Sequence, residues 1–156
     1  MDYVTTCPSP IGMLYLRSDG CSLTGLSPES GGIPVEDLPV FALTRQWLDA
    51  YFRGDDPDPA GLPLAPGGTP FQRAVWAQLL TIPRGCSRSY GQIARAIGKP
   101  GASQAVGQAV GRNPIGIIIP CHRVLGADGA LTGFAWGLEK KKWLLCHEGV
   151  DFIDHS

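Results

Sequence analysis

The sequence predicts an α+β fold in two parts: a small N-terminal α/β domain, with a short antiparallel sheet and a helix, and a mainly helical second domain. Apolar and polar residues alternate near the N-terminus, which is the period of a half-buried strand. Later segments repeat apolar residues at helical spacing. A Pro/Gly-rich stretch at residues 55–70 separates the two patterns, so we place the domains at 1–66 and 67–156.

In the first domain, Ile11 to Leu16 alternate as a strand does, and Ser18-Asp19-Gly20 is typical of a turn. Leu23 and Leu26 then predict a second strand, so the two form a hairpin. The segment PVFALTRQWLDAYFRG, residues 39–54, predicts a helix that ends at Gly54.

The second domain is predicted to contain four helices, at residues 71–82, 89–98, 102–112 and 138–150. In the last helix we expect Leu138, Leu144 and Leu145 to face a core and the lysines at 140–142 to face solvent. Gly149 is a candidate C-cap for this helix.

The two middle helices are joined by the short turn Lys99-Pro100-Gly101, which is typical of a helix-turn-helix. Gln104, Gln108 and Arg112 recur every four residues and therefore share one stripe of the second helix. Its Ala and Gly residues would allow close approach to a partner helix or to a nucleic-acid groove, although ordinary helical hairpins show the same pattern. The interpretation is a winged helix-turn-helix-like DNA-binding domain.

Charge is divided unevenly along the chain. Residues 1–66 carry nine acidic and three basic side chains, net −6, whereas residues 67–156 carry ten basic and five acidic ones, net +5. Residues 67–127 contain seven Arg or Lys and no carboxylate. A polyanion partner for the second domain is the favoured explanation, and docking of a basic half on an acidic half is the alternative.

Other classes of protein are disfavoured by composition. No apolar run is long enough to span a bilayer, and the N-terminus lacks the features of a secretory signal. Five cysteines without a CxxC pair argue against a disulfide framework and favour a reducing compartment, so we expect a cytoplasmic protein without a membrane partner.

The segment IIIPCHRVLG, residues 117–126, places a cysteine beside a histidine and an arginine at the end of an apolar run. A cysteine in such a place is often an inert buried side chain. However, His122 offers a base, and Arg123 with the wider basic field favours the thiolate. Because adjacent side chains usually point apart, we expect His122 to reach Cys121 through a turn or one water, with Glu148 orienting the imidazole. His147 is the alternative base.

A zinc site is disfavoured, because Cys121-His122 and Cys146-His147 are adjacent pairs rather than pairs at ligand spacing. We therefore expect no metal. Cys7, Cys21 and Cys86 are most simply structural.

Several segments of the second domain also resemble a known protein family. PCHRV at 120–124, with GRNP before it and LTGFAWGLEKKKWLLCHEG after it, resembles the active-site region of the O6-alkylguanine-DNA alkyltransferases. The resemblance extends back through TPFQRAVWAQLLTIPRG, SYGQIARAIG and AVGQAVGRNP and covers about residues 69–149. The first domain is similar only through SPIGMLYL.

The resemblance implies a suicidal repair reaction without a cofactor, in which a monomer takes the alkyl group from O6 of guanine in double-stranded DNA. Cys121 corresponds to the alkyl acceptor, His122 to the water-linked base and Glu148 to the partner of that base. Asn113 corresponds to the residue that braces the active-site turn, and Tyr90 to the one that rotates the nucleotide and donates a proton. The implied DNA contacts are Tyr90, Gln104, Ala105, Gly107, Arg112 and Arg123, and the implied pocket walls are Val124, Phe134, Ala135, Trp136 and Gly137.

One position departs from the family pattern, and another is a position at which family members vary in size. Gln104 stands where an arginine usually fills the space left by the flipped base, which predicts weaker flipping or affinity. Trp136 is a large ring that should narrow the pocket and favour methyl over benzyl groups. A sensor that binds alkylated DNA without repair and a thiol hydrolase or peroxidase are the alternative functions. The presence of Cys121 argues against the first, and the second gives residues 90–113 no role.

Overall fold

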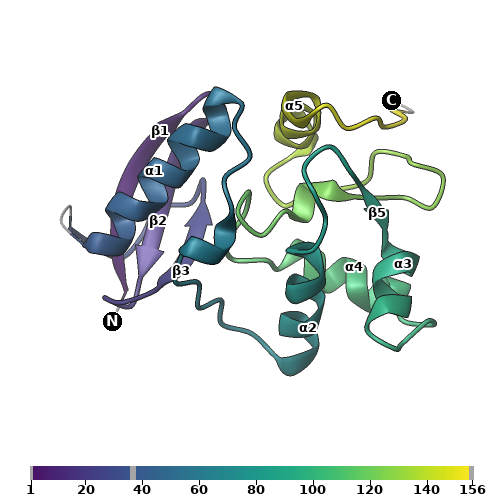
Figure 1. The fold of residues 1–156 in the computed structure, drawn as a ribbon. Coiled ribbons are helices and arrows are strands. Elements are labelled where there is room, and N and C mark those ends of the chain that lie inside the picture. Colours follow the sequence, from purple (N-terminus) through teal and green to yellow (C-terminus); the bar gives the residue numbers. More distant parts are fainter. Residues whose placement is uncertain (1, 36–37, 155–156) are drawn as a thin grey trace. The chain divides into compact units, whose positions relative to one another are not determined.

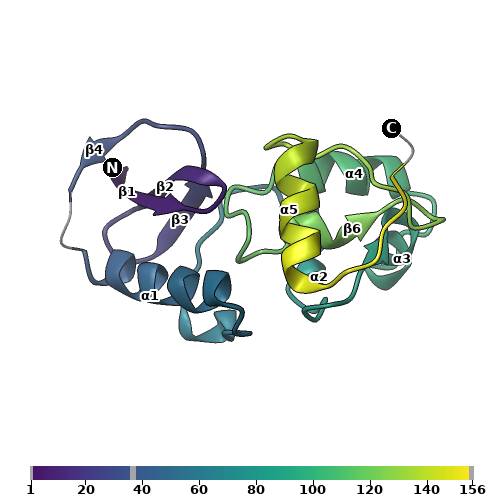
Figure 2. The same ribbon diagram turned by 90° about the horizontal axis from the view of Figure 1, so that it is seen from above.

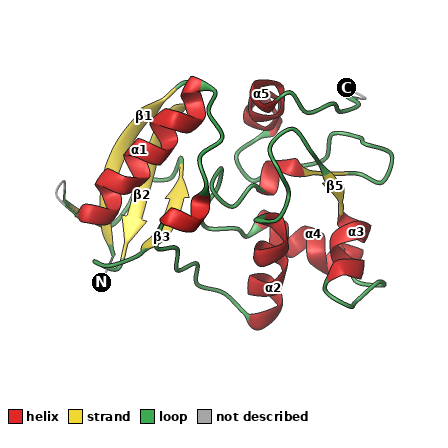
Figure 3. Ribbon diagram, viewed as in Figure 1, coloured by secondary structure: helices red, strands yellow, loops and turns green. Residues whose placement is uncertain are grey.

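The structure is a computed structural model that describes residues 2–35 and 38–154. The chain divides into two compact units, Met1–Gly67 with Pro114–Gly116, and Gly68–Asn113 with Ile117–Ser156. The first division falls one residue after the predicted boundary. Residues 114–116 return to the first unit, and no sequence signal indicates this. The helices and strands confirm the predicted α+β class (Figure 3).

The first unit is built on a four-stranded sheet in the order β3-β2-β1-β4. Its strands are β1 (Tyr3–Ser9), β2 (Gly12–Ser18), β3 (Leu23–Ser27) and β4 (Ile33–Pro34). The pairs β1/β2 and β2/β3 are antiparallel, and β4 joins β1 in parallel. The predicted hairpin is therefore β2–β3, while β1 was not predicted from the sequence.

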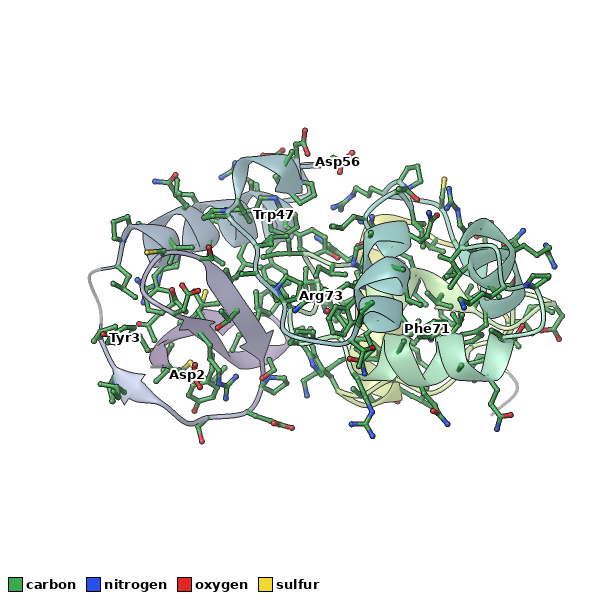
Figure 4. The ribbon with its side chains drawn as sticks, turned by 90° about the horizontal axis from the view of Figure 1, so that it is seen from below. Asp2, Tyr3, Trp47, Asp56, Phe71 and Arg73 are labelled. Carbon is green, nitrogen blue, oxygen red and sulfur yellow. The ribbon has the colours of Figure 1, made fainter. Side chains whose placement is uncertain are left out.

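Helix α1 (Pro39–Arg53) lies across the sheet and ends at Gly54, whose φ of 102° is the left-handed C-cap conformation (Figure 1). The buried face of the helix includes Val40, Phe41, Thr44, Leu48 and Tyr51. On the sheet, Leu14 and Leu16 are fully buried whereas Met13 is 45% exposed, so the even-numbered side chains of β2 face the core. Figure 4 labels Tyr3 at the start of β1 and Trp47 on α1. A short 3₁₀ turn, η1 (Pro59–Gly61), follows.

The second unit contains α2 (Pro70–Leu79), α3 (Tyr90–Ala96), α4 (Ser103–Gly111) and α5 (Leu138–Glu148). Each confirms a predicted helix, with ends shifted by a few residues. The first three pack against one another (Figure 1), and the Trp76 indole N–H donates to the Ala109 carbonyl across 2.8 Å. Helices α2 and α3 begin with capping boxes formed by Thr69 with Gln72 and by Ser89 with Gln92.

A short parallel ladder connects the helix-turn-helix to the segment after Cys121. Strand β5 (Arg88–Ser89) pairs with β6 (Val124–Leu125), which directly follows the 3₁₀ turn η2 (Cys121–Arg123). Helix α5 packs against η2 (Figure 2). The start of α3 and the cysteine turn are thus held in one framework.

Two orientations in α5 were predicted wrongly. Leu138, at the first position of the helix, is 42% exposed, whereas it was expected to face the core. Lys141 is 1% exposed, whereas it was expected to face solvent with its two neighbours. Successive residues of a helix are turned by about 100°, so three consecutive lysines cannot share one face. Within residues 2–35 and 38–154, no helix has the length and apolar character needed to cross a membrane.

Candidate active site

Cys121 opens the 3₁₀ turn η2, and its side chain is buried. The preceding residues Ile117 to Ile119 are also buried, and Ile117 has a φ of 67°, a left-handed conformation that is strained for a β-branched residue. The Asn113 side-chain amide donates to the Ile119 carbonyl across 2.8 Å. Asn113 thus braces the backbone two residues before Cys121, as the resemblance implied.

Behind the cysteine, His122 and Glu148 form a buried pair. The His122 Nε2 lies 2.6 Å from Glu148 Oε2, and both side chains are fully inaccessible to solvent. An ionised carboxylate only accepts, so Nε2 carries the hydrogen of the neutral ring and Nδ1 presents a lone pair. Nδ1 is buried without a hydrogen-bond partner among the described residues. An orphaned acceptor of this kind is a suitable site for a bridging water.

Arg123 does not lie where a DNA contact would need it. Its Nε donates to Glu148 Oε1 and its Nη1 to the Ile82 carbonyl, each across 2.6 Å, and its side chain is 11% exposed. The expectation that Arg123 contacts DNA is therefore corrected: it is an internal partner of Glu148. Arg123 faces inward because the buried Glu148 carboxylate would be costly without a cationic partner.

The ionisation of these groups follows from burial and pairing. Burial raises the pKa of the Cys121 thiol to about 11, and Asn113 and the Lys141 charge oppose it only in part. The expectation that basic surroundings favour a resting thiolate is thus wrong, since desolvation outweighs them and Arg123 is paired with Glu148. Burial also lowers the pKa of His122. Burial alone would raise the pKa of Glu148, but His122 and Arg123 together hold it well below its ordinary value.

Cys121 lines a pocket of about 280 Å³. Its other walls are Tyr90, Gly107, Val110, Gly111, Asn113, Gly133, Phe134, Ala135 and Trp136. Three of the five predicted wall residues are among them. Val124 is instead fully buried in β6, and Gly137 is the N-cap of α5.

The outer face of α4 carries the remaining predicted DNA contacts. Gln104, Ala105, Gln108 and Arg112 are exposed, while Val106, Ala109 and Val110 are buried. Gly107 lies between the two faces and lines the pocket, and a Cβ added there would lie 3.6 Å from the Tyr90 ring. The helix thus presents a polar stripe beside the pocket that contains Cys121.

The structure also separates the two candidate bases. His147 stacks on Trp143 with ring centroids 4.8 Å apart, and its carbonyl accepts from Arg84. Glu148 pairs with His122 rather than with His147, so the predicted Glu148–His122 arrangement is the one formed. Among the described residues no three His, Cys, Asp or Glu side chains are grouped so that they could hold a metal ion.

Two polar residues beside the pocket escaped the sequence reasoning. The Lys141 Nζ donates to the Val124 carbonyl across 2.8 Å and to Thr132, and the Thr132 hydroxyl lies 2.7 Å from the Tyr90 hydroxyl. The helical period of α5 could have placed Lys141 on the Leu144–Leu145 side. No local signal marks Thr132.

The fold and the site define a helix-turn-helix protein with a buried thiol centre. Residues 70–150 match the family described as "6-O-methylguanine DNA methyltransferase, DNA binding domain". A methylated-DNA–protein-cysteine methyltransferase of Haemophilus influenzae is 45% identical, and the match covers 97% of this chain and 89% of that protein. A methylated-DNA–protein-cysteine methyltransferase of Methanosarcina acetivorans is 46% identical, and the match covers 94% of this chain and 98% of that protein. The chain therefore belongs to the 6-O-methylguanine DNA methyltransferase family.

Two solved structures are similar to this chain over most of its length. The O6-methylguanine methyltransferase of Mycobacterium tuberculosis has a TM-score of 0.84 at 45% identity, covering 96% of this chain and 93% of that one. The OGT of the same organism in complex with DNA has a TM-score of 0.85 at 46% identity, with coverage of 94% and 92%. Both similarities extend over the two units of the chain.

Proposed function

We propose that the protein repairs DNA by direct reversal, moving an alkyl group, preferentially methyl, from O6 of guanine in double-stranded DNA to its own Cys121. The observation that carries this proposal is the buried thiol in a small pocket with the His122–Glu148 pair behind it. The family and the named relatives support the reaction class. The acceptor is consumed, so each molecule acts once and needs no cofactor.

The chemistry begins with the thiol proton. A water between Cys121 and the free Nδ1 of His122 would carry the proton to the imidazole, and Glu148 would stabilise the imidazolium that forms. Because the resting pKa of Cys121 is high, the thiolate forms only when this relay takes its proton. The thiolate is the strong, soft nucleophile that attack at an alkyl carbon requires.

In the transfer step the sulfur–carbon bond forms as the carbon–O6 bond breaks, and the electron pair of the broken bond leaves on the guanine. A proton donor beside the base stabilises this leaving group. Tyr90 lines the same pocket as Cys121, and we assign it as the proton donor to the departing guanine. The thioether product is a poor leaving group, so the enzyme is not regenerated.

The target carbon lies within the base stack, so the nucleotide must leave the duplex to reach Cys121. The exposed stripe of α4, Gln104 with Gln108 and Arg112, lies beside the pocket and would meet the DNA. A pocket of about 280 Å³ is just below the roughly 300–1,000 Å³ usual for ligand sites. Together with the Trp136 ring, this size favours methyl over benzyl adducts.

Intact mass spectrometry with a duplex carrying one O6-methylguanine tests the proposal. We expect a gain of one methyl per protein, mapped to Cys121, and no further gain with excess duplex. Cys121→Ala should abolish the gain and keep DNA binding. Tight binding without a mass gain in the unaltered protein would instead indicate a sensor, and repeated turnover would indicate a hydrolase.

A further inference from the structure

Lys141 is a buried cation without an anionic partner in the part of the chain that the structure describes. Its Nζ faces four oxygens: the Val124 carbonyl at 2.8 Å, the Thr132 hydroxyl at 3.1 Å, the Thr132 carbonyl at 3.2 Å and the Gly133 carbonyl at 3.4 Å. Burying an ammonium among neutral acceptors is costly. A well-packed apolar side chain would be the cheaper solution for a residue with a structural task alone.

These acceptors lie on two different segments of the pocket region. Val124 directly follows the cysteine turn, while Thr132 and Gly133 begin the segment that supplies the pocket walls Gly133 to Trp136. The ammonium also lies 6.0 Å from the centroid of the Phe134 ring. One side chain thus ties the wall segment to the strand that follows the turn with the nucleophile.

The Thr132 hydroxyl connects this ammonium to Tyr90. It lies 3.1 Å from the Lys141 Nζ and 2.7 Å from the Tyr90 hydroxyl. An ammonium has three donor hydrogens and no lone pair, so it cannot accept a hydrogen bond from Thr132. Of the two partners that the structure gives the Thr132 hydroxyl, only the Tyr90 oxygen can accept its hydrogen, so this hydrogen is satisfied when Thr132 donates to Tyr90.

The direction of the hydrogen bond between Thr132 and Tyr90 decides where the phenolic hydrogen can point. When Tyr90 accepts from Thr132, its own phenolic hydrogen is not used in that bond and is available to the pocket that Tyr90 lines. Burial raises the pKa of Tyr90, so this hydrogen is present at neutral pH. Without the ammonium, Thr132 and Tyr90 could exchange donor and acceptor roles, and the phenolic hydrogen could turn away from the pocket.

We propose that Lys141 and Thr132 are positioning residues that fix Tyr90 as a hydrogen-bond donor toward the base in the pocket. The inference rests on the proposed alkyl transfer and names two further residues for it. Neither residue touches the substrate. Lys141 cannot accept the hydroxyl hydrogen of Thr132. Thr132 therefore directs this hydrogen to the Tyr90 oxygen.

The test is a double-mutant cycle on single-turnover transfer, with the rate at saturating duplex and the dissociation constant for DNA measured separately. General acid catalysis contributes about 10²–10⁴-fold, and loss of donor orientation should remove part of it, about tenfold. Thr132→Val, which keeps the shape and loses the hydroxyl, should slow transfer by about tenfold and leave the dissociation constant within about twofold. Thr132→Ser, which keeps the hydroxyl, should remain close to the unaltered protein.

The Tyr90→Phe background separates positioning from a structural role. There Thr132→Val should cause no further loss of rate, because the hydroxyl that it orients is absent. Lys141→Met should lose part of its rate in both backgrounds, because the Lys141 charge also lowers the pKa of Cys121, so Thr132→Val carries the test. An undiminished rate in Thr132→Val, or equal losses in both backgrounds, would overturn the inference while methyl transfer by the unaltered protein still stands. No methyl gain in the unaltered protein would overturn the proposed function and this inference with it.

Discussion

Glu148 uses its two carboxylate oxygens for two different residues, His122 and Arg123, each at 2.6 Å. We predict that Glu148→Gln destabilises the protein by roughly 3–5 kcal/mol, the range for breaking a buried ion pair, because Arg123 loses its anionic partner. It should also slow alkyl transfer, because an amide no longer selects the His122 tautomer that leaves Nδ1 free. Denaturant unfolding and single-turnover rates measure the two effects. Glu139→Gln is the matched control, since Glu139 lies on the same helix and is 93% exposed.

The same carboxylate predicts how stability depends on pH. The folded protein holds the pKa of Glu148 below the ordinary value of 4.5, so the unfolded chain takes up the proton first as the solution is acidified. The stabilisation is therefore complete above about pH 4.5 and declines below it. His122, whose pKa is also lowered, adds a decline that begins below 6.5. In Glu148→Gln the decline below pH 4.5 should be smaller, and an unchanged profile would show that Glu148 is not its source.

At the scale of single residues, sequence reasoning singled out the side chains proposed for the transfer chemistry and missed side chains that contact them or the pocket. Cys121, His122 and Glu148 were singled out because a Cys-His pair ends an apolar run and a carboxylate could orient the imidazole, and the family resemblance then implied the same residues. Lys141 was predicted to face solvent because runs of lysine are usually exposed. Arg123 was predicted to contact DNA because basic residues beside a DNA-binding site usually do so. Burial decides both cases, and it depends on contacts with Ile82, β6 and the 132–133 segment that no local pattern contains.

The first turn of α3 has a direct connection to the site, because Tyr90 follows the capping residue Ser89. The Ser89 hydroxyl accepts from the Gln92 N–H across 3.1 Å, and Gln92 accepts from the Ser89 N–H across 2.8 Å. Ser89→Ala should destabilise the protein by about 1 kcal/mol, as loss of an N-cap does. It should also slow transfer, because the cap fixes the start of a helix of only seven residues.

Thr69→Ala is the control for that prediction. Thr69 forms the same capping box at the start of α2, but no residue next to it lines the pocket. Thermal unfolding should show similar losses in the two variants, and only Ser89→Ala should reduce the single-turnover rate. Equal rates in both would show that the cap stabilises α3 without orienting Tyr90.

At the scale of elements, the helices were predictable because their apolar period and end signals are local. Gly54 and Gly149 ended the helices that they were expected to end. Strand β1 was missed because Val4 and Cys7 alternate poorly with two threonines between them. Strands β5 and β6 contain two residues each, too few for any periodic signal. Their pairing depends on tertiary contacts, although it fixes the start of α3 next to the cysteine turn.

For the whole molecule, the uneven charge is the property most directly linked to a polyanion. The second unit contains the carboxylate-free stretch 67–127 except residues 67 and 114–116, and within it Arg73, Arg95, Lys99 and Arg112 are exposed. Counterion release from DNA makes the logarithm of affinity fall with the logarithm of salt by about 0.9 for each phosphate neutralised. DNA affinity should therefore fall steeply with salt, and a flat dependence would contradict a phosphate-contacting face.

Arg112 allows this prediction to be tested at one position. It is exposed at the C-cap of α4, on the same stripe as Gln104 and Gln108, so we expect it to contact a phosphate. Arg112→Gln should reduce the salt slope of duplex binding by about 1 and weaken binding to alkylated and undamaged duplexes equally. Arg53→Gln is the control, because Arg53 is exposed in the acidic first unit and pairs with Asp55. Titration of a labelled duplex at several salt concentrations measures both slopes. A reduction in the Arg53 variant equal to that in the Arg112 variant would mean that net charge, rather than a phosphate contact of α4, sets the salt dependence.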